Sequence, residues 1–247
     1  MLAIDNLKKH FGFVKAVDNV NLDIAEGEIV SIIGTNRAGK TTLVNLISGY
    51  IKPDSGRILF FDKDITHASP YVRIKLGVGR SFQLIQLFGG ITVLDNVRTA
   101  LFSKYGMIRK AFLPAERYSS ITEEAIKILD NFNISDKKDF TPKGLSEGDL
   151  KILDIAIAFA LKSKLLLLDE PTSGVATSDK FKVMDSIVSA IKKEGISTLI
   201  IEHDMDIVSG YSDRVVVMHE GRIMAQGKPE EVMENKEVKA TVFGIVS

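Results

Sequence analysis

The sequence predicts an α/β fold with a mostly parallel central sheet and an inserted helical segment. Residues 29–33 form an almost unbroken apolar run, which is typical of a strand buried on both faces of a parallel sheet. A loop with a glycine at each end follows this run, and a helical pattern follows the loop. From residue 92 to 161 strand signals give way to helical patterns, and strand signals return at residues 165–168. This order indicates an α/β core that is interrupted by a helical insertion.

In the first ninety residues, strand and helix signals alternate between turn and cap residues. Residues 20–24 alternate between apolar and polar, which predicts an exposed strand. Gly49 lies near the end of the first helical pattern, and Ser69-Pro70 and Gly77 are a good start and stop for the second. The expected elements after the strand at 29–33 are a helix at 40–48, a turn at 53–56, a strand at 57–61 and a short helix between Ser69 and Gly77.

Three helical patterns follow Thr92, Thr122 and Ser146, whose side chains are suited to capping a helix N-terminus. Residues 104–120 give a mixed pattern that predicts no particular element. After this insertion the strand and helix signals alternate again. The expected elements are a strand at 165–168, a helix at 179–193 ended by Gly195, a strand at 197–201, a hairpin of 215–218 and 222–225 around Glu220-Gly221, and a short last helix that Pro229 opens.

The composition is that of a globular protein without net charge, since 32 Lys and Arg residues balance 32 Asp and Glu residues among 247. Proteins that bind the nucleic-acid backbone usually carry a basic excess, so we expect no nucleic-acid partner. The absence of cysteine excludes disulfides, thiolate zinc sites and cysteine nucleophiles. No eighteen apolar residues run together, and the first ten residues do not form a signal peptide. We therefore expect a cytoplasmic protein that reaches a membrane only through a partner.

Residues 34–41 (GTNRAGKT) fit the phosphate-loop pattern G-x-x-x-x-G-K-[ST], between a predicted buried strand and a predicted helix. Glycines let successive N–H groups point at phosphate oxygens, and the helix N-terminus adds its positive end. In such a loop Lys40 reaches the β- and γ-phosphates and the Thr41 hydroxyl ligates Mg²⁺. The alternative is a purely structural glycine-rich turn, which the strand, loop and helix order disfavours.

Two acidic residues, Asp169 and Glu170, follow the apolar run at 165–168. A buried strand that simply ends in polar residues is common and is the simpler interpretation. Beside a phosphate loop, the functional interpretation is favoured. Asp169 then holds the water shell of Mg²⁺, while Glu170 orients or deprotonates an attacking water.

With the remaining motifs, the chain resembles the ATP-binding subunits of ABC transporters over essentially its full length. Residues 145–149 (LSEGD) stand where that family has its LSGGQ-type signature, at the start of a helix. Gln83 matches the Q-loop, and His203 matches the switch histidine at the end of a strand. Phe11 occupies the place of the aromatic residue that stacks on adenine. His10, His67 and His219 have no ligand-like spacing and receive no role.

The resemblance implies a RecA-like P-loop core with a mostly parallel sheet, an N-terminal antiparallel β subdomain and an inserted α-helical subdomain. The implied boundaries are residues 1–91 and 163–247 for the two parts of the core and 92–162 for the helical subdomain. The implied catalytic residues are Glu170, His203, Gln83 and Lys40. The implied ATP-binding residues are Phe11, Gly34, Thr35, Asn36, Arg37, Ala38, Gly39, Lys40, Thr41, Thr42, Ser146 and Gly148. The implied Mg²⁺ ligands are Thr41, Gln83 and Asp169.

The resemblance also implies partners. In this family two ATPase subunits meet head to tail, and each ATP contacts the phosphate loop of one subunit and the signature of the other. Ser146, as an N-cap, leaves the N–H groups of Glu147 and Gly148 facing such an anion. Loss of this bridge on hydrolysis opens the dimer. Transmembrane permease subunits are the second kind of partner, which places the chain at the cytoplasmic face of a membrane without insertion into it.

Four residues depart from the family pattern. Thr35 and Arg37 replace the usual proline and glycine of the phosphate loop, and Arg37 either adds a positive group near phosphate or restricts the backbone. Glu147 with Asp149 puts two carboxylates where a γ-phosphate is expected, and Ala176 replaces the usual acidic or amide residue after Ser173-Gly174. We hypothesise that ATP binds normally while ATP-driven dimer closure is weakened, or that a non-identical ATPase subunit compensates.

Within the family, residues 78–83 (VGRSFQ), 92–97 (TVLDNV) and 201–205 (IEHDM) are similar to the subunits that import branched-chain amino acids. Two alternatives stay open: an ATPase subunit for lipid or lipopolysaccharide export, and a soluble ABC-type ATPase of an assembly or regulatory system. An ordinary P-loop GTPase is disfavoured, because residues 235–238 (NKEV) resemble a guanine-reading loop only superficially.

Overall fold

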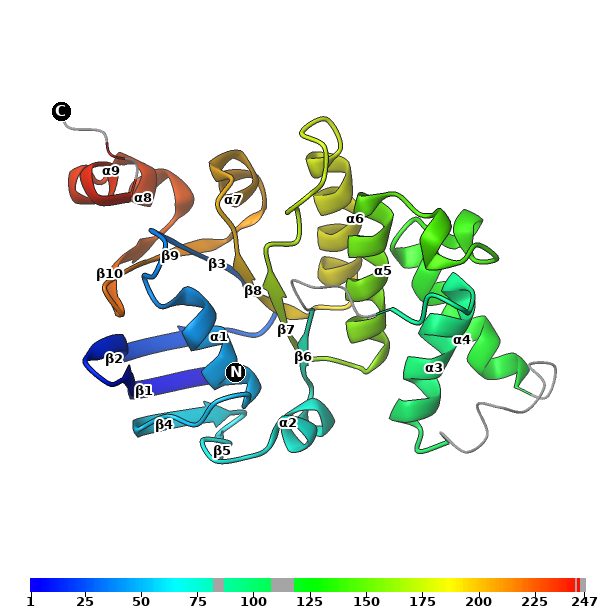
Figure 1. Cartoon of the computed structure of the whole chain (residues 1–247), viewed down its shortest axis with the longest axis horizontal. Coiled ribbons are helices and arrows are strands. Elements are labelled where there is room, and N and C mark those ends of the chain that lie inside the picture. The colour runs from blue at the N-terminus through cyan, green and yellow to red at the C-terminus, as the bar shows by residue number, and fades with distance from the viewer. Residues whose placement is uncertain (82–86, 108–117, 243, 245–247) are drawn as a thin grey trace.

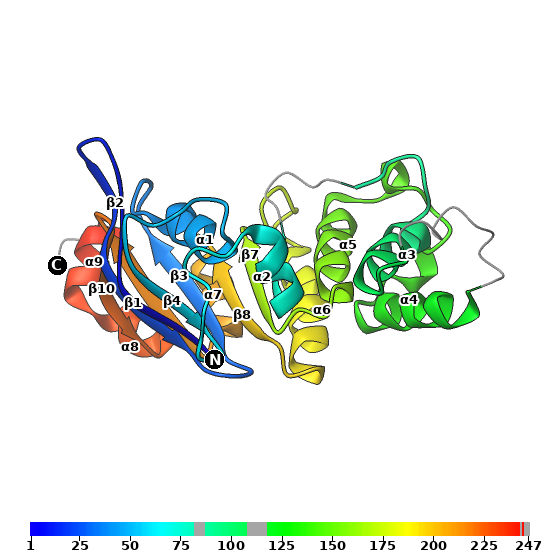
Figure 2. The same ribbon diagram turned by 90° about the horizontal axis from the view of Figure 1, so that it is seen from below.

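The computed structural model describes residues 1–81, 87–107, 118–242 and 244. Figures 1 and 2 show an elongated molecule with its strands at one end and a helical part at the other. The α/β fold class predicted from the sequence is confirmed. None of the helices in the described residues is both long and apolar enough to cross a bilayer.

The central sheet has six strands in the order β10-β9-β3-β8-β7-β6, of which only the β9–β10 pair is antiparallel. Every residue of β3, β7 and β8 is buried, as the apolar runs predict. The strands are β3 (Ile29–Gly34), β6 (Val78–Arg80), β7 (Leu165–Asp169), β8 (Ser197–Ile201), β9 (Arg214–His219) and β10 (Arg222–Gly227). The predicted mostly parallel sheet and the C-terminal hairpin are confirmed.

A second, antiparallel sheet has the strand order β2-β1-β4-β5. Its strands are β1 (Leu2–Phe11), β2 (Val14–Ile24), β4 (Ser55–Phe60) and β5 (Lys63–Asp64). The alternation at 20–24 is part of β2, whose apolar side chains are buried there. The sequence pattern does not predict β1, because its pairing with β2 shifts register at three places and its apolar residues therefore do not alternate regularly.

Helix α1 (Lys40–Ser48) packs between the two sheets (Figure 1), since its apolar side chains share one core with β1, β2 and β4 and with β3 and β8. The predicted ends of α1 and of α2 (Pro70–Leu76) are confirmed, with Gly49 and Gly77 as left-handed C-caps. The remaining helices of the core are α6 (Lys180–Lys193), α7 (Met205–Tyr211), α8 (Pro229–Glu234) and α9 (Lys236–Val242). No sequence pattern predicted α7, and the prediction that the helix at Pro229 is the last is wrong, because α9 follows it.

The buried guanidinium of Arg73 joins α2 to the end of α1. Its side chain is 1% exposed and donates to four backbone carbonyls. The acceptors are the oxygens of Leu46 at 2.6 Å, Ile47 at 2.7 Å, Thr66 at 2.9 Å and Ala68 at 3.0 Å. Burial lowers the pKa of Arg73 to about 10, so the guanidinium stays charged at neutral pH.

In the described residues, the helical part contains α3 (Val93–Lys104), α4 (Ser119–Asn131), α5 (Glu147–Ala160) and the short 3-10 turns Ser135–Lys137 and Pro142–Gly144. Thr92 and Ser146 are N-caps as predicted, and each accepts the N–H of the residue three positions later. The prediction for Thr122 is wrong. Its N–H already bonds to the carbonyl oxygen of Tyr118, so it lies inside the first turn of α4. The three domain boundaries stay a prediction.

Candidate nucleotide-binding and hydrolytic site

The loop at 34–39 connects the end of β3 to the start of α1, as the motif requires. Gly34 and Gly39 have φ angles of 150° and 102°. A Cβ atom on Gly34 would lie 2.1 Å from the carbonyl oxygen of Met218, and one on Gly39 would lie 2.1 Å from that of Ala16. Both positions therefore admit only glycine, for reasons of backbone packing as well as conformation.

Arg37 adopts a φ of 70°, in the left-handed region. A residue with a Cβ atom is strained there by about 1–2 kcal/mol, whereas glycine is not. This φ angle is consistent with a restricted backbone, and both predicted effects of Arg37, that restriction or an added positive group near phosphate, stay predictions. Its side chain is exposed and lines a pocket of about 330 Å³ beside Lys40, Thr41 and Thr42.

Lys40 is nearly buried, and its ammonium group donates to the carbonyl oxygens of Gly34 at 2.7 Å and Thr35 at 3.0 Å. Burial lowers the pKa of Lys40, while the charges of Glu170 and Asp169 oppose this shift. The side chain of Lys40 therefore connects the end of the phosphate loop to its beginning. The same 330 Å³ pocket is lined by Asn36, Ala38, Gly39, Glu170 and His203.

Two parallel neighbours, β7 and β8, end at this edge of the sheet and bring Glu170 and His203 together. The Nε2 atom of His203 lies 3.1 Å from Oε1 of Glu170, although 33 residues separate them. Glu170 has a φ of 52°, an unusual conformation that tends to occur at functional positions. The candidate general base thus faces the phosphate loop with the histidine as its partner.

Asp169 is 4% exposed and lies 3.3 Å from the Nη2 atom of Arg80. Burial raises the pKa of Asp169, and the charge of Arg80 opposes this shift. Arg80 also donates to Oδ1 of Asn45 at 2.6 Å. Arg80 is a partner of Asp169 that was not predicted from the sequence, although β6 precedes Gln83 and pairs with β7. Gln83 itself lies outside the described residues.

Oxygen donors suited to Mg²⁺ lie at this edge, namely the Asp169 carboxylate and the hydroxyl of Thr41. Thr41 is in the first turn of α1 and lines the phosphate-loop pocket. A cluster of three or more His, Cys, Asp and Glu side chains is absent from the described residues. The oxygens of Asp169 and Thr41 fit a metal that also takes oxygens from phosphate and water, as Mg²⁺ does.

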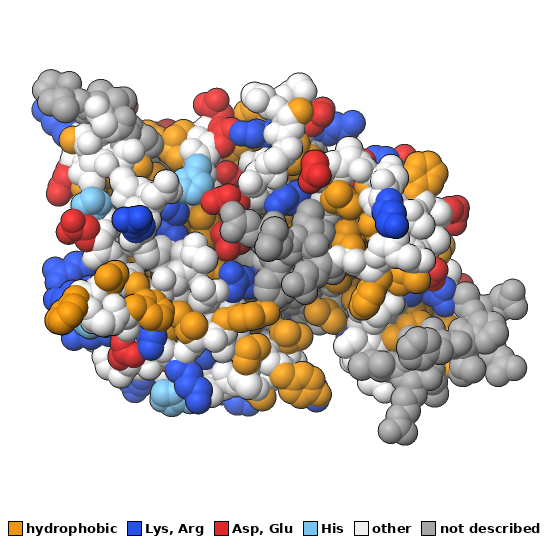
Figure 3. All heavy atoms as spheres, viewed as in Figure 1, with side chains coloured by type: hydrophobic (Ala, Val, Ile, Leu, Met, Phe, Trp, Pro, Cys, Tyr) orange, Lys and Arg blue, Asp and Glu red, His pale blue; other side chains and the backbone are white. Residues whose placement is uncertain are grey.

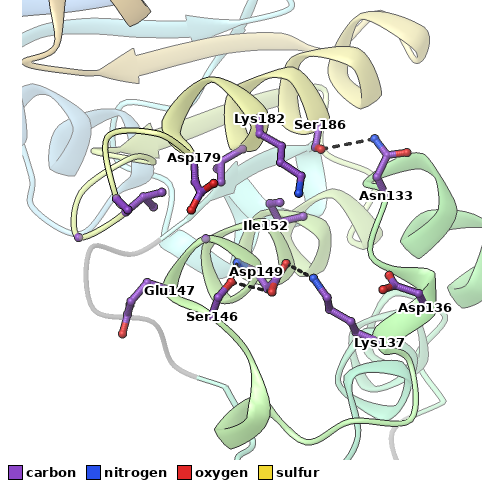
Figure 4. Close-up of a pocket in the computed structure, with 15 residues that line it drawn as sticks. Asn133, Asp136, Lys137, Ser146, Glu147, Asp149, Ile152, Asp179, Lys182 and Ser186 are labelled. Carbon is purple, nitrogen blue, oxygen red and sulfur yellow. Dashed lines mark hydrogen bonds and ion pairs between the residues drawn. The ribbon is translucent and has the colours of Figure 1, made fainter.

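The signature residues line a different pocket, of about 560 Å³, between α5, α6 and the loop at 174–176 (Figure 4). Ser146 Oγ accepts the N–H of Asp149 at 3.2 Å and donates to its Oδ2 at 2.6 Å. Lys137 donates to Oδ1 of Asp149 at 2.5 Å. Although burial opposes it, hydrogen bonds from Lys137 and Ser146 lower the pKa of Asp149. Within the described part of the chain, Glu147 has no ion-pair partner and is exposed.

Gly148 lies where α5 packs on α6, because a Cβ atom there would be 2.9 Å from Val183.

Phe11 ends β1 and is 51% exposed, with the Lys9 ammonium 5.5 Å from its ring centroid. The side of the phosphate-loop pocket nearest this strand is lined by Val14 and Ala16 rather than by Phe11. The adenine-stacking role of Phe11 stays a prediction.

The sequence model of the ABC transporter family matches residues 17–173, more than half of the chain. The chain belongs to the ABC transporter family. This ABC ATPase is 35% identical to the probable branched-chain amino acid transport ATP-binding protein LivG of Archaeoglobus fulgidus, over 99% of this chain and 95% of that one. It is 32% identical to the lipopolysaccharide export system ATP-binding protein LptB of Haemophilus influenzae, over 99% and 97%.

Solved structures of ABC ATPases share its fold. The ADP conformation of MJ1267, an ATP-binding cassette of an ABC transporter, has a TM-score of 0.86 at 33% identity and covers 99% of both chains. The dimer of the cassette MJ0796 with ADP and Pi has a TM-score of 0.76 at 25% identity, covering 93% of this chain and 99% of that one. This ABC ATPase is thus an ATP-binding, ATP-hydrolysing subunit.

Proposed function

We propose that this ABC ATPase energises the import of branched-chain or related amino acids. The similarity to LivG proteins over nearly the whole of both chains supports this substrate class. The similarity to an LptB protein favours a second candidate, an ATPase subunit for lipid or lipopolysaccharide export. Both candidates use the same ATPase chemistry, and they differ in the transported molecule and its direction.

The observation that carries the hydrolytic mechanism is the meeting of Glu170 and His203 beside the phosphate loop. Glu170 orients the attacking water and accepts its proton, and His203 contacts the γ-phosphate. Lys40 exchanges its two bonds to the loop carbonyls for bonds to the β- and γ-phosphates. Thr41, Asp169 and Gln83 would hold Mg²⁺, which would neutralise phosphate charge when bound.

A head-to-tail pair of ATPase subunits is the proposed working form. Ser146 and the phosphate loop line different pockets of one chain. An ATP can therefore contact both kinds of residue when the phosphate loop of one subunit faces Ser146 of another. The dimeric cassette MJ0796, with which this chain shares its fold, supports such a pair. The second subunit is either the same chain or a homologous one.

An exposed apolar surface around α2 supports docking on transmembrane permease subunits at the cytoplasmic face of the membrane. Tyr71, Val72 and Ile74 lie on α2 and Tyr50 follows α1, and all four are between 41% and 64% exposed. Figure 3 shows hydrophobic side chains at the lower edge of the molecule, over α2. Apolar side chains gathered in this way on one face of a soluble subunit indicate a protein interface.

The ATPase mechanism is tested by measuring ATP hydrolysis by the parent chain and by Glu170→Gln. The variant is expected to bind ATP with parental affinity and to hydrolyse it at least about a hundredfold more slowly, as loss of a general base predicts. Undiminished hydrolysis would remove Glu170 from its role. Lys236→Gln, on α9, is a control that should hydrolyse ATP at the parental rate.

The substrate class is tested on the complex. The tagged chain is expected to co-purify with a multi-spanning membrane protein. After reconstitution into vesicles, that complex should accumulate labelled leucine when ATP is supplied on the side of the ATPase. ATP-dependent extraction of lipopolysaccharide instead would support the second candidate, and purification without any membrane protein would contradict both.

A further inference from the structure

Glu202 carries a buried carboxylate and has no role in the hydrolytic mechanism proposed above. It follows β8 directly, immediately before His203, and is 3% exposed. A buried carboxylate is costly unless hydrogen bonds or an opposite charge compensate it. The charge of Lys180, whose ammonium group pairs with Asp204, also acts on Glu202. Among the described residues, the direct contacts of the Glu202 carboxylate are hydrogen-bond donors of two loops.

Each oxygen of the Glu202 carboxylate serves a different loop. Oε1 accepts from Thr172, from its N–H at 3.2 Å and from its hydroxyl at 2.6 Å. Oε2 accepts the N–H of His203 at 3.0 Å and that of Asp204 at 3.5 Å. One carboxylate therefore joins the loop that follows Glu170 to the loop that carries His203.

This bridge supplements one backbone bond between the same two segments, from the N–H of Glu170 to the carbonyl oxygen of Ile201 at 3.0 Å. Glu170 and His203 follow neighbouring strands, and the 3.1 Å contact between their side chains depends on how the two loops leave the sheet. We infer that Glu202 is a positioning residue for ATP hydrolysis, which fixes the loops of Glu170 and His203 relative to each other. This inference rests on the catalytic roles proposed for those two residues.

A glutamine cannot replace this carboxylate. All of its partners donate, and they need two accepting oxygens, whereas an amide offers one oxygen and turns an NH₂ group toward the other loop. With the NH₂ group toward His203, the N–H of His203 loses its acceptor. With the NH₂ group toward Thr172, the hydroxyl can turn to accept, but the N–H of Thr172 loses its acceptor. Either orientation loosens one loop.

The test compares steady-state ATP hydrolysis and ATP affinity of the full chain with those of Glu202→Gln. Small misplacements of catalytic groups cost up to about a hundredfold in rate. We expect kcat to fall at least about tenfold, while the dissociation constant of a fluorescent ATP analogue stays within about twofold. Thr172→Val, which keeps the shape and loses the hydroxyl, should lower kcat less, and Thr172→Ser should restore the parental kcat.

Glu28→Gln is the matched control. Glu28 also accepts a backbone N–H, that of Ala25 at 2.8 Å, and pairs with Arg214, but it lies just before β3, at the opposite edge of the sheet. The Glu28→Gln variant should have a lower melting temperature and the parental kcat.

A parental kcat in Glu202→Gln, or a joint loss of kcat and ATP affinity, would overturn the inference about Glu202 and leave the proposed function standing. A parent chain that binds ATP without hydrolysing it would overturn the proposed function and the inference with it.

Discussion

Lys137 and Asp149 form an ion pair at the start of α5, with Nζ 2.5 Å from Oδ1, and the other oxygen of Asp149 accepts the hydroxyl of Ser146. Figure 4 shows the three side chains in one chain of contacts along the pocket. The Ser146 hydroxyl is thus already donated to a carboxylate, and Lys137 partly neutralises that carboxylate. Of the two acidic residues in the signature, Asp149 is compensated within the subunit, whereas Glu147 has no ion-pair partner among the described residues.

Lys137→Met is expected to weaken ATP-driven dimerisation by about fivefold, because it leaves the Asp149 charge facing the γ-phosphate of the second subunit. The measurement is the dissociation constant of the dimer in saturating ATP, by light scattering, in a Glu170→Gln background that prevents hydrolysis. In an Asp149→Gln background the same substitution should have no effect. An equal loss in both backgrounds would show that Lys137 does not act through Asp149.

Glu147→Gln is expected to strengthen ATP-driven dimerisation, because it removes an exposed charge that repels phosphate at the N-terminus of α5. Glu147→Gly should give a similar gain if charge alone is responsible. The dissociation constant of the dimer is measured by light scattering for the parent and both variants, at low ionic strength and in 0.5 M salt. Screening in 0.5 M salt should reduce the difference between the parent and the variants. Equal dimerisation of parent and both variants would refute the hypothesis of weakened closure.

Arg37→Gly is expected to stabilise the nucleotide-free fold by about 0.5–1 kcal/mol, since the relief of left-handed strain exceeds the entropic cost of glycine. The measurement is the free energy of unfolding in urea. Arg57→Gly is the control. Arg57 lies in β4 and its own φ is not positive, so this substitution should destabilise the fold by about 1 kcal/mol. Destabilisation by both substitutions would contradict the strain at Arg37.

Gly39→Ala is expected to cost more than about 3 kcal/mol of folding free energy, because the added Cβ would meet the carbonyl oxygen of Ala16. Gly210→Ala provides the contrast. It lies in α7 with nothing within 4 Å of its Cβ position and should gain about 0.5–1 kcal/mol through helix propensity. Urea unfolding of both variants tests the pair, and similar values for the two would be the contradicting result.

Much of the fold follows from local signals, because the parallel strands are short apolar runs and the helix ends carry cap residues such as Ser69 and Gly49. The strand β1 escaped prediction because bulges break its alternation. Thr122 misled because a threonine in the first helical turn looks the same in sequence as one at the cap. Only the hydrogen bond of its N–H to Tyr118 distinguishes the two cases.

The phosphate loop could be predicted because its residues are contiguous and their spacing is imposed by phosphate geometry. The partnerships of Glu202 with Thr172 and of Lys137 with Asp149 could not, since each joins residues 12 or more positions apart through tertiary structure. Arg80 beside Asp169 is a similar case, separated by 89 residues and set by the pairing of β6 with β7. Contiguous motifs can thus be predicted from residue spacing, whereas contacts between distant residues depend on the order of the strands in the sheet.

The four carbonyl bonds of Arg73 have a mechanical consequence. Two of them go to carbonyl oxygens in the last turn of α1, the helix whose first turn follows the phosphate loop, and two go to the segment that leads into α2. Arg73 thereby connects the end of α1 to α2, so that the phosphate loop and the docking surface proposed on α2 belong to one connected unit. A displacement of α1 would therefore also move α2 and the docking surface that we propose on it.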